Sequence, residues 1–151
     1  MVSIKLDSIN NIPRTENTFP KLLLKHANER ASHPAFRQKR LGIWQTLSWQ
    51  QTKETTENLS LGLSGLGLKR GDKTAIIGQN TTMMYLSMLA LQSLGGVIVP
   101  IFPDASAEEF QSLLAHAEIK AVICQDQEQI DKMESVKKNI KSLEFLIFEQ
   151  P

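Results

Sequence analysis

The chain has 151 residues, of which 41% are hydrophobic and 22% are charged, and its formal net charge is +1. This size and balance predict one soluble globular domain with a single core. A net charge so close to zero argues against a nucleic-acid partner. One cysteine cannot form an internal disulfide, no apolar run approaches the ~18 residues of a membrane span, and the first residues lack the apolar core of a signal peptide. We therefore expect a cytoplasmic protein.

The chain is expected to consist of a flexible leader, 1–17, followed by one subdomain over 18–151. Thr18 is suited to cap a helix over Phe19–Arg30, because its hydroxyl can accept a hydrogen bond from the first turn. Pro20 fits that first turn, where a missing N–H breaks no helical hydrogen bond. The folded part of the chain should therefore begin with a helix.

A β-hairpin is predicted after this helix. Two short runs, Ala35–Gln38 and Ile43–Leu47, flank the turn Lys39–Gly42. Gly42 can adopt the positive φ that tight hairpin turns require.

A second helix should follow the hairpin at once. Ser48 and Gln51 have the spacing of a capping box, which satisfies two backbone N–H groups at a helix start. The helix should end near Leu66, where Gly65 and Gly67 release it. One side of the helix carries Thr52, Thr55, Leu59, Leu63 and Leu66.

The segment from Arg70 to Phe110 predicts a parallel βαβ unit. A strand over Lys73–Gly78 leads to a helix over Thr82–Leu94, for which Asn80 offers a capping oxygen. The helix is apolar around most of its circumference, so we expect it to be buried between the sheet and another layer.

Gly95 and Gly96 are expected to end this helix, at least one of them with a positive φ. The next strand, Val97–Ile101, has the β-branched residues of a buried parallel strand. Ser106 and Glu109 then form a second capping box.

The rest of the chain continues the alternation of helix and strand. We expect a helix over Ala107–Ala117, a strand over Ala121–Cys124, a helix over Asp126–Asn139 and a strand over Phe145–Phe148. The predicted fold class is therefore α/β, with a partial parallel sheet built from βαβ units, covering helices and an N-terminal β-hairpin.

Three stretches of this chain resemble the start of the AMP-forming acyl-CoA synthetases, especially the long-chain fatty-acid ligases: GIWQTLSWQQ from Gly42 to Gln51, LKRGDKTAIIGQN, and LALQSLGGVIVPIFPDASAEEF. Leu47–Trp49 resembles the first core motif of this adenylate-forming superfamily, and Leu91–Pro103 resembles the second. The resemblance covers about Thr18 to Pro151. It implies a subdomain of the large N-terminal domain of adenylate-forming enzymes.

The resemblance implies a two-step ligase in full length. ATP and a fatty acid give an acyl-adenylate and pyrophosphate, and coenzyme A then displaces AMP. The family's Ser/Thr/Gly-rich phosphate loop ending in Pro-Lys, its magnesium segment, its ribose-binding Asp and its catalytic Lys match no stretch of this chain. We therefore expect no catalytic residue, no metal site and no cofactor bound by this chain, while ATP, Mg²⁺ and CoA belong to the full-length enzyme.

One loop is a candidate for ligand contact. Residues Phe102–Ser106 follow the carboxyl end of a parallel strand, where ligands of open α/β sheets bind. The resemblance places the equivalent loop beside the channel for the CoA pantetheine arm, which makes Phe102, Asp104 and Ser106 candidates for the channel wall. The alternative is that these residues form only a turn and a helix cap. Asp104, where many relatives have a small residue, departs from the family pattern.

Other polar residues are interpreted structurally. His26, His33 and His116 lack metal-ligand spacing among themselves or with Cys124, which we expect to pack in the core. The spacing Gly65-x-Gly67 precedes a strand, so it lacks the order of a dinucleotide fingerprint. Two basic clusters are interpreted as solvated faces: Arg37, Lys39 and Arg40 at the hairpin, and Lys132, Lys137, Lys138 and Lys141 along a late helix.

The methionine-rich helix has two interpretations. Met83, Met84 and Met88 either form plain core or a flexible wall for an acyl chain.

The leading hypothesis is that the chain is the N-terminal fragment of a long-chain fatty-acid CoA ligase. This fragment would act as a structural scaffold and would be inactive by itself. The alternative is a stand-alone binding or interaction module that keeps the fold without the chemistry. The resemblance implies that fatty acid and CoA are partners of the full-length enzyme. It also suggests that the full-length enzyme associates peripherally with membranes. An incomplete sheet would also make the fragment self-associate.

Overall fold

The computed structural model describes residues 13–149. The chain forms two compact units, Met1–Glu54 and Thr55–Pro151, where its composition predicted one core. We refer to them as the N-terminal unit and the C-terminal unit. Most of the expected leader, residues 1–12, lies outside the described residues.

The N-terminal unit begins with helix α1, Phe19–Glu29, as predicted. The Thr18 hydroxyl accepts a hydrogen bond from the N–H of Lys21 at 3.4 Å, and Pro20 lies in the first turn. Leu23 and Ala27 are buried. Because residues four apart share one face of a helix, these two side chains form the inner side of α1.

The predicted hairpin follows as strands β1, Pro34–Arg40, and β2, Ile43–Ser48, which pair antiparallel. Arg40 lies opposite Ile43, so the connection has only two residues, Leu41 and Gly42. Their φ angles are +49° and +81°. Two positive φ angles in a row are typical of the type I′ turn, whose twist matches that of the strands. The expected positive φ of Gly42 is confirmed.

Helix α2, Trp49–Gly65, starts directly after the hairpin. The Ser48 hydroxyl accepts from the N–H of Gln51 at 3.2 Å, and the Gln51 side chain accepts from the N–H of Ser48 at 2.9 Å. This reciprocal pair confirms the predicted capping box. Residues up to Glu54 belong to the N-terminal unit and the later turns belong to the C-terminal unit.

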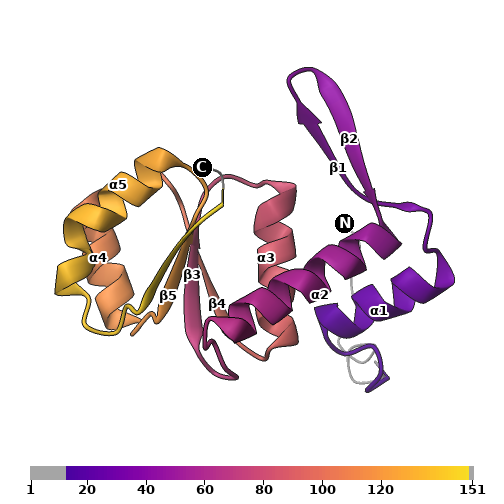
Figure 1. Ribbon diagram of the computed structural model, residues 1–151, viewed down its shortest axis with the longest axis horizontal. Coiled ribbons are helices and arrows are strands. Elements are labelled where there is room, and N and C mark those ends of the chain that lie inside the picture. Colours follow the sequence, from indigo (N-terminus) through magenta and orange to yellow (C-terminus); the bar gives the residue numbers. More distant parts are fainter. Residues whose placement is uncertain (1–12, 150–151) are drawn as a thin grey trace, which may run out of the picture. The chain divides into compact units, whose positions relative to one another are not determined.

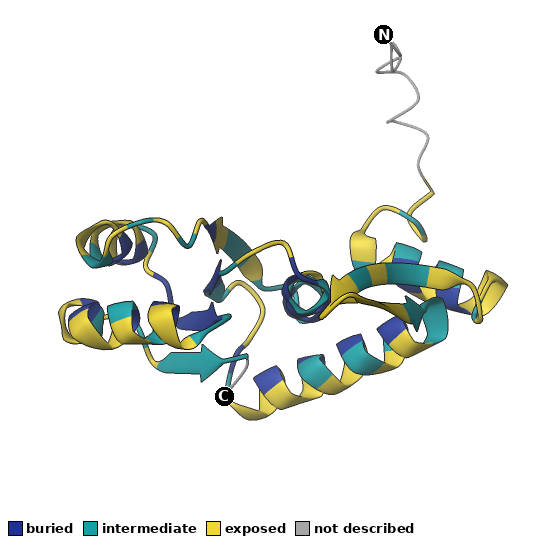
Figure 2. Cartoon of the chain, turned by 90° about the horizontal axis from the view of Figure 1, so that it is seen from above, coloured by how far each residue is buried: buried dark blue, intermediate teal, exposed yellow. Residues whose placement is uncertain are grey.

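The C-terminal unit is built on a four-stranded sheet of order β4-β3-β5-β6. Its strands are β3 (Lys73–Ile77), β4 (Val97–Ile101), β5 (Ala121–Cys124) and β6 (Phe145–Phe148), and every pair is parallel. The two inner strands are buried almost completely. Strand β6 lies at one edge, where Figure 2 shows it in teal as half-buried.

Strand β4 forms the other edge, so the prediction of a buried position for Val97–Ile101 was wrong. Val97 and Pro100 are exposed. Proline has no N–H to donate to a neighbouring strand and is therefore confined to sheet edges. Pro100 was the residue in this run that argued for an edge.

Besides the later turns of α2, the C-terminal unit has the helices α3 (Thr82–Ser93), α4 (Ala107–His116) and α5 (Gln127–Val136), the last followed by a short 3₁₀ turn, Lys137–Asn139. In Figure 1, α4 and α5 cover one face of the sheet and α3 covers the other. This three-layer arrangement confirms the predicted α/β class.

The predicted cap of α3 was wrong. Thr81, and not Asn80, has the extended backbone of the cap, and its hydroxyl accepts from the N–H of Met84 at 3.1 Å. A capping oxygen reaches only the N–H groups two or three residues ahead, so one residue decides the assignment.

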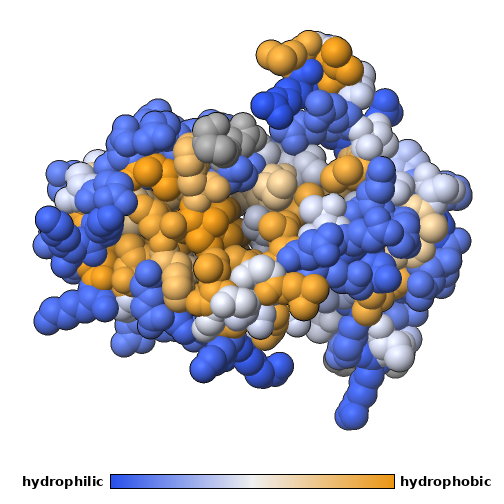
Figure 3. All heavy atoms as spheres, viewed as in Figure 1, coloured by the Kyte–Doolittle hydropathy of each residue, from blue (hydrophilic) through white to orange (hydrophobic). Residues whose placement is uncertain are grey.

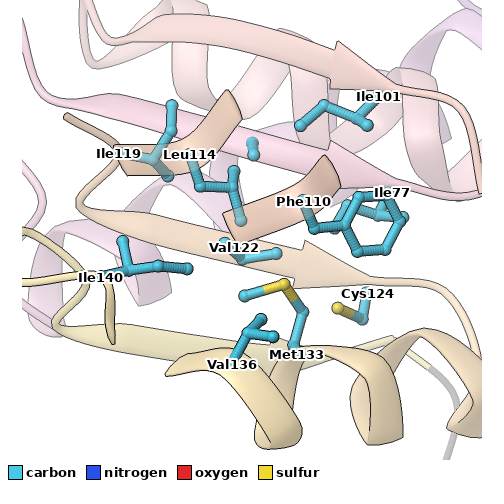
Figure 4. Packing of buried hydrophobic residues seen from close by; sticks show 11 residues of the cluster. Ile77, Ile101, Phe110, Leu114, Ile119, Val122, Cys124, Met133, Val136 and Ile140 are labelled. Carbon is cyan, nitrogen blue, oxygen red and sulfur yellow. The ribbon is translucent and has the colours of Figure 1, made fainter. Parts of the chain in front are cut away.

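The core between the sheet and helices α4 and α5 is drawn in Figure 4. It contains Ala75, Ile77, Ile101, Phe110, Leu114, Ile119, Val122, Cys124, Met133, Val136 and Ile140. The core on the other face brings Met84 and Leu91 of α3 against Ile76 and Ile123 of the sheet. Ser60 of α2 donates to the carbonyl of Ala90 in α3 at 3.0 Å. Helix α3 is thus buried between the sheet and α2, and the core interpretation of Met84 is confirmed.

Helix α3 ends in the predicted glycine pair. The N–H of Gly96 donates to the carbonyl of Leu91 at 2.9 Å, and that of Gly95 donates to the carbonyl of Gln92 at 3.0 Å. These two bonds form the Schellman motif, in which the residue after the cap takes a left-handed backbone. Gly95 has a φ of +74°, which confirms the expectation.

Candidate functional site

The loop after β4 lies at the carboxyl edge of the sheet, as expected. Phe102 is 84% exposed, and Asp104 and Ser106 are exposed as well. The Ser106 hydroxyl accepts from the N–H of Glu109 at 3.3 Å, and Glu109 accepts from the N–H of Ser106 at 2.8 Å. Ser106 therefore caps α4, while Phe102 and Asp104 are presented outward. Their contact with a CoA channel stays a prediction.

Lys132 of α5 holds this loop in place. Its ammonium donates to the carbonyl of Pro103 at 2.9 Å, pairs with Glu128 at 2.9 Å and lies 5.8 Å from the ring centre of Phe110. The interpretation of Lys132 as part of a solvated face was therefore wrong, because its side chain is mostly buried between α5 and the loop. A single lysine on a helix carries no signal in the sequence for such a long-range contact.

The carboxyl ends of the inner strands β3 and β5 are bridged by Gln125. Its side chain accepts a hydrogen bond from the N–H of Gln79. A β-carbon on Gly78 would lie 2.7 Å from the β-carbon of Gln125, which cannot swing away as the end of a side chain can, so this close approach favours glycine. Gln125 thus fills the position where open α/β sheets commonly bind ligands. The glycine directly after the strand was the only signal for this contact in the sequence.

A second glutamine at this edge is buried without a complete set of partners. Gln129 lies in the first turn of α5 and is 2% exposed. Its N–H donates to the capping carboxylate of Asp126 at 3.1 Å, whereas its side-chain oxygen has no hydrogen-bond partner among the described residues. An unpaired buried acceptor destabilises a fold by about 1–3 kcal/mol. The sequence reasoning missed this residue.

Cys124 ends strand β5 inside the core. Burial, with a smaller contribution from the charge of Asp126, raises the pKa of its thiol to about 12. The thiol is protonated at neutral pH and cannot act as a nucleophile, because the thiolate is the reactive form. The prediction that Cys124 packs in the core is confirmed.

An ion pair organises the opposite, amino-terminal edge of the sheet. Lys120 and Asp72 lie 2.8 Å apart, and Lys120 also donates to the carbonyl of Gly67 at 3.2 Å. The Asp72 carboxylate accepts from the N–H of Lys69 at 2.8 Å. The hydrogen bond from Lys120, followed by that from Lys69, lowers the pKa of Asp72. The polar groups at this edge therefore bond to one another and hold the loops before β3 and β5 together, and the carbonyl of Gly67 accepts one of these hydrogen bonds from Lys120.

An apolar groove of about 560 Å³ runs between α2 and the edge strand β6. It is lined by Thr55, Asn58, Leu59, Gly62, Leu63, Leu66 and Ile147. The sequence placed four of these residues on one side of α2, and strand β6 completes the groove. No charged side chain lines it, so it is suited to apolar contact and not to acid–base chemistry.

Residues 13–149 contain neither a cluster of metal ligands nor a membrane-spanning helix. In this part of the chain no three His, Cys, Asp or Glu residues are placed to hold a metal ion. None of its helices combines the length and apolarity needed to cross a bilayer. His26 packs its ring on Trp49, with ring centres 4.6 Å apart, as expected for a packing histidine.

Comparison with known proteins gives the same family along almost the whole chain. Residues 23–150 match the family model of the AMP-binding enzymes. The long-chain-fatty-acid–CoA ligase ACSBG2 of Mus musculus is 30% identical over 131 residues, which are 82% of this chain and 20% of that protein. Its Homo sapiens counterpart is 26% identical over 122 residues, 81% of this chain and 18% of that protein. The chain thus spans about a fifth of the length of these curated relatives.

Solved structures agree on the fold. A fatty acyl CoA synthetase of Mycobacterium tuberculosis superposes with a TM-score of 0.78 at 20% identity, over 86% of this chain and 26% of that one. The anthranilate CoA ligase AuaEII in complex with anthranoyl-AMP superposes with a TM-score of 0.81 at 20% identity, over 95% of this chain and 27% of that one. The chain therefore belongs to the AMP-binding enzyme family.

Proposed function

We propose that this chain is the N-terminal scaffold of a long-chain fatty-acid CoA ligase and is inactive by itself. The full-length enzyme would convert ATP, a fatty acid and CoA into acyl-CoA, AMP and pyrophosphate. One observation carries the proposal: residues 23–150 match the family, yet no stretch of the chain matches the phosphate loop or the other nucleotide-binding segments. Phosphoryl chemistry depends on such donors and cations around the developing charge.

Two features of the described residues bear on this proposal. Gln125 fills the space between the carboxyl ends of β3 and β5, and residues 13–149 supply no carboxylate cluster for a metal. These observations support a scaffold role: the sheet and its helices hold the loops on which a nucleotide site would be mounted. Among those loops, we propose that Phe102 and Asp104 face the CoA channel, with Ser106 fixing the turn.

The proposal predicts that the pure chain forms no acyl-adenylate. ATP–pyrophosphate exchange, measured with a fatty acid and Mg²⁺, should remain at the level of the reaction without protein, because the groups that hold ATP are missing. A full-length relative serves as the positive control. An exchange rate that depends on both the fatty acid and the protein would contradict the proposal.

A second candidate function is a stand-alone interaction module, which the apolar groove favours. Its lining residues and the open edge of β6 offer apolar surface and unpaired backbone groups to another chain. Figure 3 shows hydrophobic atoms gathered on this face of the C-terminal unit. We propose that the chain self-associates here, whether or not it also serves as a scaffold.

Self-association should be visible in light scattering as a mass above 17.0 kDa that rises with concentration. Leu66→Lys, which places a charge in the groove, should restore the monomer. Leu61→Lys, at an exposed leucine in the last turns of α2 and outside the groove lining, is the matched control and should leave the mass unchanged. A constant monomer mass up to high concentration would contradict this prediction.

Location and membrane contact complete the proposal. A cytoplasmic location is consistent with one buried, reduced cysteine. Peripheral membrane association would bring a ligase of water-insoluble fatty acids to its substrate.

A further inference from the structure

The free end of the β1–β2 hairpin exposes three large apolar side chains that lie close together in the sequence. Leu41 is 95% exposed, Ile43 is 70% exposed and Trp44 is 58% exposed. Figure 3 shows hydrophobic atoms gathered at the tip of the hairpin, with hydrophilic atoms beside them. Single exposed apolar residues are ordinary, whereas a group at the end of a projecting element indicates a contact surface.

Leu41 is unfavourable at its position in two ways. Its φ of +49° belongs to the left-handed region, which asparagine and glycine adopt far more readily than leucine. Its side chain also contacts almost nothing, so burial does not offset the backbone strain. Both effects are offset if the side chain is buried against another surface. Strain at an exposed apolar turn residue therefore points to docking.

Basic residues surround this apolar tip. Lys39 lies opposite Trp44 in the hairpin register, and Arg40 lies opposite Ile43. The guanidinium of Arg37 lies 5.2 Å from the ring centre of Trp44. The sequence has no acidic residue between Pro34 and Lys53. The hairpin thus combines an apolar tip with basic side chains and has no acidic side chain.

We propose that the hairpin tip docks on an anionic lipid bilayer. Leu41 and Ile43 would enter the boundary between headgroups and acyl chains, and the ring of Trp44 would lie at headgroup level, where indole rings are favoured. Arg37, Lys39 and Arg40 would pair with lipid phosphates and carboxylates. A second copy of the hairpin is a poor partner, because it would bring six cations together. This inference rests on the membrane association proposed above and names the surface that carries it.

The full chain should co-sediment with vesicles of phosphatidylcholine and phosphatidylserine in a 3:1 ratio, and only weakly with phosphatidylcholine alone. Replacing Arg37, Lys39 and Arg40 together by Gln should weaken binding on the order of 100-fold, since each basic residue near an anionic surface contributes about fivefold. The matched control replaces Lys137, Lys138 and Lys141 by Gln, which removes the same charge elsewhere and should leave binding within about threefold.

The apolar contribution has its own pair of variants. Leu41→Asn fits the positive φ and should weaken binding roughly tenfold by removing buried apolar surface. Leu61→Asn, at an exposed leucine on α2, should have no effect. Vesicles with brominated acyl chains should quench the wild-type fluorescence, and Trp44→Phe, which retains Trp49, should abolish that quenching.

Three results would overturn the inference: no binding to the anionic vesicles, equal losses in the two triple variants, or quenching that persists in Trp44→Phe. Self-association that Leu41→Asn abolishes, without lipid binding, would identify a protein surface as the occupant and would also overturn it. None of these results bears on pyrophosphate exchange, so failure here is distinguishable from failure of the ligase proposal.

Discussion

We expect Phe110→Ala to lower the free energy of unfolding by about 3–5 kcal/mol. Phe110 is fully buried in the core between the sheet and helices α4 and α5, where the ring lies among Ile77, Leu114 and other apolar residues (Figure 4). Removing the ring loses its transfer free energy and leaves a cavity that the packed layers cannot close. Urea unfolding followed by far-ultraviolet circular dichroism measures the change.

Phe102→Ala is the matched control for this substitution. Phe102 lies in the loop that precedes α4 and is exposed, so its truncation should change stability by no more than about 0.5 kcal/mol. Domains of this size are typically stable by only about 5–15 kcal/mol, so the core variant should lose a large part of its stability. Equal effects of the two variants would contradict the assignment of core and surface around α4.

We expect Gly95→Val to destabilise the fold by on the order of 1–3 kcal/mol. Gly95 has a φ of +74°, and a β-carbon there would lie 3.0 Å from Cγ of Arg70. Its carbonyl also accepts from the N–H of Gly71 at 3.0 Å, which joins the end of α3 to the turn before β3. A β-branched residue is strained in this backbone conformation whatever space surrounds it.

Gly65→Val is the control for the glycine substitution. Gly65 is the last residue of α2, its φ is not positive, and a β-carbon there meets nothing within 4 Å. Thermal unfolding should show a lower midpoint for Gly95→Val and little change for Gly65→Val. If both variants melt together with the wild type, the left-handed turn contributes no strain energy and the account of the helix end is wrong.

The sequence alone predicted those features that depend on neighbouring residues. The capping boxes at Ser48 and Ser106 connect residues three apart, and the hairpin turn at Gly42 needs only local backbone geometry. The alternation of apolar runs predicted every helix and strand of the C-terminal unit to within a few residues. The motifs around Trp49 and Val97 indicated the family for the same reason, because each motif is a short contiguous stretch of sequence.

Errors in the sequence analysis arose where one residue decided between two local solutions or where strand order mattered. Thr81 and Asn80 both offer a capping oxygen, and only the starting point of α3 selects Thr81. Val97–Ile101 is apolar enough for either a central or an edge strand, and its place follows from pairing with β3 alone. Periodicity contains no information on which strand lies beside which.

The tertiary structure alone decided the contacts between distant residues. Lys132 reaches Pro103, Gln125 reaches Gln79, and Lys120 reaches Asp72, each across several elements of the fold. The exposure of Leu41 and Trp44, and the joining of Ile147 to the face of α2, were likewise fixed only by packing. The physical reason is that such contacts depend on the strand order and on which sheet face each helix covers, and the packing of the whole chain selects both.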